Sequence, residues 1–152
     1  MSGPDNPAET VAAWQSGDVS EPNELQTIAA IAIGGVVGSS ARWAVATQLT
    51  PGAVDGFPWQ TFVVNVIGCL LIGIAAGRID RPSIAWAFVA TGVLGGFTTM
   101  SGFAVQLNDF AEAGETTTMV TYLAATLVVG FGALAAGERL SGSVDDDPEG
   151  IE

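Results

Sequence analysis

The polar side chains that could do chemistry lie inside long apolar runs of the sequence. Thr61 and Asn65 are four residues apart, which places a hydroxyl and an amide on one face of a helix. Both groups can donate hydrogen bonds, as an anion requires when it gives up its water. The same spacing is also typical of hydrogen bonds that join two helices in a membrane, so both uses stay open.

The most informative segment is residues 92–103, which read GVLGGFTTMSGF. Gly92, Gly95 and Gly96 precede the hydroxyl residues Thr98, Thr99 and Ser101 there, and Gly102 follows them. A straight transmembrane helix seldom gathers so many weak helix formers at its centre, so we predict a helix that is broken at mid-membrane. A broken helix exposes carbonyls that suit a hard cation and N–H groups that suit an anion. A helix that is only kinked is the alternative.

Two further features stand in the first and last apolar runs. Arg42 follows Gly34 and Gly38 on one helix face, where it could anchor a vestibule, attract an anion or extend toward the membrane surface. Tyr122 and Thr126 are one helical turn apart and form a short ladder of hydroxyls. The ladder could line a polar track, and plain packing accounts for it equally well.

The remaining composition excludes most catalytic chemistry. The sequence contains no Lys and no His, which excludes a histidine base and a P-loop lysine. The apolar runs hold no pair of carboxylates, no nucleophile beside a base and no metal-ligating cluster, so we expect no enzyme. The strong acidic excess makes nucleic-acid binding very unfavourable. A proton-coupled multidrug exporter needs a carboxylate at mid-membrane, where these runs have no Asp or Glu. It stays an alternative, together with a non-transporting assembly subunit.

Four apolar stretches must position these groups, and each approaches or exceeds the ~20 residues that cross a bilayer. They cover residues 26–49, 59–77, 83–110 and 117–137. The formal charge of -12 comes mainly from acidic tails at 1–25, which we expect to be disordered, and at 138–152. The sequence therefore predicts an all-α, multi-pass cell-membrane protein with one transmembrane domain at 26–137.

The charges and small residues outside these sites predict topology and assembly. Four spans place both termini on one side, and Arg78, Arg81 and Arg139 favour the cytoplasm for that side. Small residues recur four apart, which allows close helix approach in lipid. These pairs are Gly34 and Gly38, Gly73 and Gly77, and Gly92 and Gly96. Four helices alone make a thin bundle with little room for a pathway, so we expect an oligomer.

Three blocks of this sequence resemble the Fluc (CrcB) family of fluoride channels. Residues 34–42 resemble the family's first-span glycine-rich stretch, which ends in Arg. Residues 61–68 resemble its second-span pattern Thr-x3-Asn-x2-Gly. Residues 95–103 resemble its third-span signature Gly-Gly-x-Thr-Thr-Phe-Ser-Thr-Phe. The resemblance covers roughly residues 26–137.

The resemblance implies an antiparallel, dual-topology homodimer with two pores, through which fluoride leaves the cell passively. It also implies a structural sodium ion held by the backbone carbonyls of Gly95 and Thr98. The fluoride pore would be lined by Asn65, Phe103, Met100, Thr61, Tyr122, Thr126 and Ser101, and the vestibule by Arg42 and Gln106.

The sequence departs from the family pattern at several positions. Met100 stands where the first pore phenylalanine is usual, and a thioether lacks the positive ring edge that can face an anion. Gly102 replaces a usual Thr, and Gln106 stands where many relatives have Glu. The arginine bias of three to none is also unusual for a dual-topology homodimer. An antiparallel heterodimer with a paralogue of opposite bias is therefore the alternative partner.

Overall fold

The computed structural model describes residues 23–48 and 56–142, and all regular structure within them is helical. In chain order the helices are α2 (Glu24–Gln48), α3 (Trp59–Ala76), α4 (Ile84–Trp86), the π-helix η2 (Ala87–Leu94), α5 (Gly95–Phe97), α6 (Met100–Glu112) and α7 (Thr116–Ser141). Residues 1–22 of the predicted disordered tail lie outside the described residues, whereas Glu24 and Leu25 of that tail already belong to α2.

Four stretches of the described chain are long and apolar enough to cross a membrane. They are α2, α3, the interrupted stretch Ile84–Glu112 and α7. This confirms the four predicted spans and the multi-pass, all-helical architecture. α7 continues through Glu138 and Arg139 to Ser141, so these residues are helical although the sequence assigned them to the C-terminal tail.

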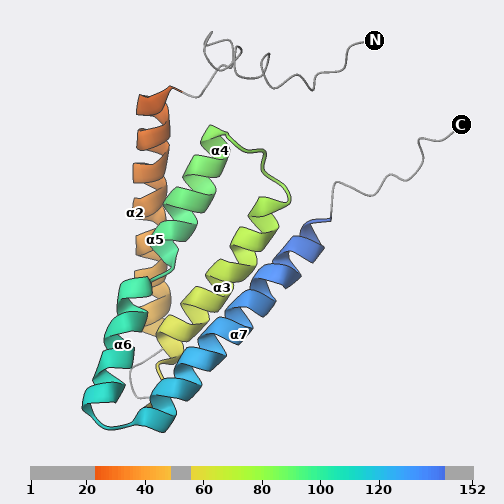
Figure 1. The fold of residues 1–152 in the computed structure, drawn as a ribbon. Helices are drawn as coiled ribbons and strands as arrows, with labels where there is room; N and C mark the ends of the chain where they lie inside the picture. Colours follow the sequence, from red (N-terminus) through yellow and green to blue (C-terminus); the bar gives the residue numbers. More distant parts are fainter. Residues whose placement is uncertain (1–22, 49–55, 143–152) are drawn as a thin grey trace, which may run out of the picture.

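The spans pack as two pairs, because glycines remove the side chains that would hold the backbones apart. α2 lies along η2 and α5, and α3 lies along α7 (Figure 1). A Cβ added at Gly38 would overlap the carbonyl of Val93, and one added at Gly73 would overlap the carbonyl of Leu134. The predicted close approach of helices at small residues is thus confirmed in both pairs.

The third span changes partners where it is interrupted. Before the interruption, η2 and α5 pack along α2; after it, α6 contacts α7 and α3. Thr98 and Thr99 have extended backbone, with φ -75 and ψ 162 at Thr98 and φ -143 and ψ 114 at Thr99. The predicted break is confirmed, and the alternative of a continuous kinked helix is wrong.

The π-helix η2, which is separated from the break only by the short α5, was not predicted. π-helical turns are rare and are found mostly at functional sites. Here η2 carries the chain from the third span's first turn to α5, which leads into the break, and both stay packed against α2.

Much of the apolar surface of the spans is uncovered by the chain itself. Between 11% and 22% of the residues in each span's most apolar window are buried. Large side chains such as Val36 and Trp43 on α2 and Val128 and Phe131 on α7 are exposed. These faces are suited to lipid or to another membrane-embedded chain.

Candidate functional site at the broken helix

Two threonines build the break itself. The hydroxyl of Thr98, the C-cap of α5, donates to the carbonyl of Leu94, the last residue of η2, at 3.0 Å. Thr99 is the N-cap of α6, and its hydroxyl oxygen accepts the N–H of Gly102 at 3.0 Å. The same hydroxyl lies 3.3 Å from that of Ser101. The hydroxyls that the sequence placed near a pore therefore also end one helix and begin the next.

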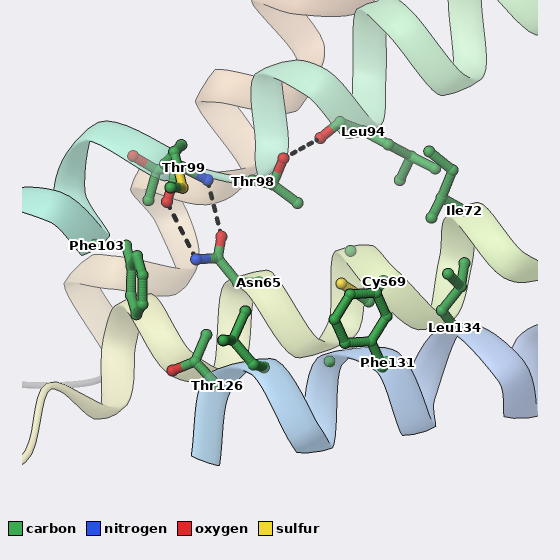
Figure 2. A pocket seen from close by; sticks show the side chains of 14 residues that line it. Asn65, Cys69, Ile72, Leu94, Thr98, Thr99, Phe103, Thr126, Phe131 and Leu134 are labelled. Carbon is green, nitrogen blue, oxygen red and sulfur yellow. Dashed lines mark hydrogen bonds between the residues drawn. The ribbon is translucent and has the colours of Figure 1, made fainter. Parts of the chain in front are cut away.

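Asn65 clamps the break from the neighbouring α3. Its Nδ2 donates to the carbonyl of Thr99 at 3.1 Å, and its Oδ1 accepts the N–H of Thr99 at 2.8 Å (Figure 2). One side-chain amide thus satisfies both backbone groups of an extended residue, which lipid could not do. Of the two uses that the sequence left open, the hydrogen bond between helices is present, and one amide N–H remains for another acceptor.

Gly68 lets α3 approach the break closely enough for this clamp. A Cβ added at Gly68 would overlap the γ-methyl of Thr98. The residue lies three positions after Asn65, so both face the same segment. The sequence pattern of residues 61–68 included this glycine, and its contact with the break is the physical reason for it.

Arg42 reaches the break from α2, on the other side. Its Nη1 donates to the carbonyl of Thr98 at 3.0 Å, across 56 positions of sequence. The guanidinium is half-buried and points to the break instead of extending along the helix toward the membrane surface. Two adjacent residues of the third span, Thr98 and Thr99, are thus held by side chains from two different spans.

The break leaves the carbonyls at the end of α5 without their helical donors, among them those of Gly95 and Thr98. The N–H of Thr99, which a continuous helix would direct to Gly95, donates instead to Asn65. The N–H of Gly102, which would serve Thr98, donates instead to the Thr99 hydroxyl. Carbonyl oxygens are the ligands that hard cations take, so the carbonyls of Gly95 and Thr98 fit the donor set that the sequence resemblance implied.

A second polar cluster surrounds Tyr122 of α7. This side chain is fully buried, and its hydroxyl donates to Oε1 of Gln106 on α6 at 2.8 Å. The Thr61 side chain also hydrogen-bonds to Tyr122. Three residues that the sequence assigned separately to pore and vestibule therefore form one hydrogen-bonded group.

Aromatic rings connect this cluster to the break. The Phe103 ring is 5% exposed and lies 5.1 Å from the Tyr122 ring, centroid to centroid. Phe57 and Phe110 meet the same tyrosine edge-on, at 5.3 and 6.1 Å. The sequence analysis missed both. A possible signal was the aromatic run around Pro58 at the start of the second span.

A groove of about 400 Å³ opens beside the break, between α3, α6 and α7. Its wall brings together Asn65, Thr98, Thr99, Phe103 and Thr126 (Figure 2). Met100 also lines it. The Thr126 hydroxyl oxygen is buried and has no hydrogen-bond partner within the described part of the chain. Met100 is 75% exposed at the rim, and Ser101 is exposed as well. The other predicted pore and vestibule residues do not line this groove: Arg42, Thr61, Ser101, Gln106 and Tyr122.

These features define a multi-pass helical membrane protein whose third span is broken and held at the break by polar side chains. Residues 29–138 match the family model described as CrcB-like protein, Camphor Resistance (CrcB). The chain belongs to this family, which is the Fluc (CrcB) family that its motifs resemble.

Curated relatives support the same assignment. Fluoride-specific ion channel FluC 2 of Streptomyces avermitilis is 42% identical over 130 residues, which cover 80% of this chain and 74% of that protein. Fluoride-specific ion channel FluC of Nitrobacter winogradskyi is 40% identical over 117 residues, which cover 74% of this chain and 93% of that protein. The matched relatives are ion channels and not enzymes.

Proposed function

We propose that this protein is a fluoride-specific channel through which fluoride leaves the cell passively. The observation that carries the proposal is the broken third span, which lies inside the region shared with relatives named fluoride-specific ion channels. Break, clamp and groove supply hydrogen-bond donors at membrane depth. An ion pathway requires such donors inside the membrane, because the ion gives up water there.

The chemistry of the groove suits a small, strongly hydrated anion. The buried Thr126 hydroxyl needs a partner, and Asn65 keeps a second amide N–H beyond the one that binds Thr99. The ring edge of Phe103 is positive and can face an anion. Together these groups replace part of the water that fluoride sheds.

The membrane potential drives the proposed export. Hydrogen fluoride is neutral, crosses lipid and dissociates in a neutral cytoplasm, which traps the anion inside. A potential that is negative inside favours anion exit by about 2.3 kcal/mol per 100 mV. No coupling ion or membrane-embedded carboxylate is needed. The acidic residues of the described spans lie near helix ends, at Glu24, Asp109, Glu112 and Glu138.

A second chain would complete the pore. The groove is open along one side, and Met100 and Phe131 at its wall are 75% and 69% exposed. We infer an antiparallel dimer in which the partner covers this face. The partner is either a second copy or a paralogue of opposite arginine bias. Expression of this chain alone settles the choice: an active dimer with both orientations in the membrane would exclude the paralogue.

A structural sodium ion fits the carbonyls of Gly95 and Thr98 in such a dimer. Two carbonyls are too few for a hard cation, so the equivalent pair of the second chain would complete the shell. A bound cation would supply a fixed positive charge near the anion pathway and would join two broken helices.

Fluoride efflux from liposomes tests the proposed function. Purified protein is reconstituted with a potassium ionophore, and fluoride and chloride efflux are measured in parallel with ion-selective electrodes. We expect fast fluoride efflux without chloride efflux, and its loss in Phe103→Ile. Phe62→Ile is the matched control, because Phe62 packs against Phe57 and Trp59 away from the groove. An exporter or an assembly subunit would show no such fluoride flux.

A further inference from the structure

We propose that Arg42 is a tethered competitor for the cation at the broken helix. Its guanidinium donates a hydrogen bond to the carbonyl of Thr98, one of the two proposed sodium ligands. It therefore raises the sodium concentration at which the site is half-saturated. The inference rests on the sodium site in the proposed function, and it assigns to Arg42 a role at that site instead of at the anion vestibule.

Arg42 binds the carbonyl oxygen of Thr98, a proposed sodium ligand, directly. Its Nη1 lies 3.0 Å from the oxygen of Thr98, a normal charge-assisted hydrogen bond. The bond joins a positive charge to a carbonyl dipole, which attracts the charge without neutralising it. α2 is held at this height by a close contact, since a Cβ at Gly96 of α5 would meet the Gly35 carbonyl at 2.6 Å. The arginine is therefore delivered to the break by a tightly packed helix pair.

The two proposed ligands differ in what else can bind them. A buried carbonyl needs a partner, and Thr98 has lost its helical donor to the N-cap of α6. Arg42 is the replacement that the chain itself supplies. Gly95 lost its helical donor to Asn65 and receives no guanidinium in exchange. When the cation is absent, Arg42 therefore satisfies the carbonyl of Thr98 but not that of Gly95.

A cation at the same oxygen must act against this arginine. Two positive charges that share one carbonyl repel each other, and the repulsion is strong where water is scarce. A bound cation therefore drives the guanidinium off the carbonyl, and sodium binding is weaker by the free energy that this displacement costs. At low sodium the break remains intact because Arg42 holds the carbonyl of Thr98.

Arg42→Gln tests the competition, since glutamine can still donate to a carbonyl but carries no charge. Thermal unfolding of the reconstituted protein is followed while sodium replaces N-methylglucamine at constant ionic strength. We expect the half-saturating sodium concentration to fall at least tenfold in the variant. Ser39→Ala is the control on the same helix, because the Ser39 hydroxyl bonds to its own helix at Gly35, 2.7 Å away; it should shift the value less than twofold.

An unchanged or higher sodium concentration in Arg42→Gln overturns the inference, and so does the absence of any sodium response in both proteins. Fluoride efflux from the same preparations reports separately on the proposed channel, so the two failures are distinguishable.

A second measurement uses the unsubstituted protein and does not depend on how the variant folds. Phenylglyoxal modification of Arg42 is followed by mass spectrometry, with exposed Arg139 as the internal reference. If sodium displaces the guanidinium, modification of Arg42 relative to Arg139 should become at least threefold faster in saturating sodium. An equal or slower rate contradicts the competition.

Discussion

Replacement of Asn65 by leucine is the sharpest test of the clamp at the broken helix. Leucine has a similar size but neither donates nor accepts, so both bonds to the Thr99 backbone, at 3.1 and 2.8 Å, are lost. A side-chain hydrogen bond in a membrane protein contributes about 0.6–1.7 kcal/mol. A buried group left unpaired costs about 1–3 kcal/mol. For two backbone groups we expect Asn65→Leu to lower the free energy of unfolding by about 2–4 kcal/mol.

The assay pairs this free energy, measured in bilayers by steric trapping, with fluoride efflux from liposomes. Asn108→Leu is the matched control: its amide bonds to Glu112 at 2.8 Å on the exposed surface of α6, so we expect a change within about 0.5 kcal/mol. Asn65→Leu should lose both stability and flux. Loss of flux with an unfolding free energy within about 0.5 kcal/mol of the parent would refute the clamp, because the amide would then serve the ion alone.

Three other substitutions probe the same region. Gly68→Ala should cost about 1–3 kcal/mol in thermal unfolding, because its Cβ would overlap the γ-methyl of Thr98; Thr98→Ser in the same chain should recover most of that loss. Tyr122→Phe removes the bond to Gln106 and should lower fluoride efflux while costing about 1 kcal/mol of stability, and unchanged efflux would exclude the hydroxyl from the pathway. Met100→Phe should raise fluoride efflux with stability within about 0.5 kcal/mol, because the side chain is 75% exposed; lower efflux would contradict the value of a ring there.

The spans and the break could be predicted because their signals are local in sequence. Apolar runs of sufficient length predict membrane helices, and the weak helix formers of residues 92–103 predict the interruption. The change of partner at the break could not be predicted in this way. It depends on which helix α6 packs against, and no feature of the α6 sequence predicts contact with α7 instead of α2.

The sequence predicted which residues form the site better than it predicted their hydrogen-bond partners. Asn65, Arg42 and Tyr122 stood out because polar groups are expensive in lipid. Their partners are set by the tertiary structure. The Asn65 amide binds a backbone carbonyl 34 positions away, and Arg42 binds one 56 positions away. Backbone groups are the same at every residue, so no sequence pattern identifies Thr98 and Thr99 as their targets. Phe57 was missed for a related reason, since an aromatic residue at a span's end is usually interpreted as an interfacial anchor.

The hydrogen bonds of Arg42 and Asn65 make the break the joint between the two helix pairs. Arg42 belongs to α2, which packs with the first half of the third span, and Asn65 belongs to α3, which packs with α7. Both side chains hold adjacent residues, so neither pair can shift against the other without loss of a hydrogen bond at the break. The groove with Phe103 and Thr126 borders this same joint. A substitution that loosens the joint must therefore change the shape of the groove, and packing and ion pathway are coupled through two residues of extended backbone.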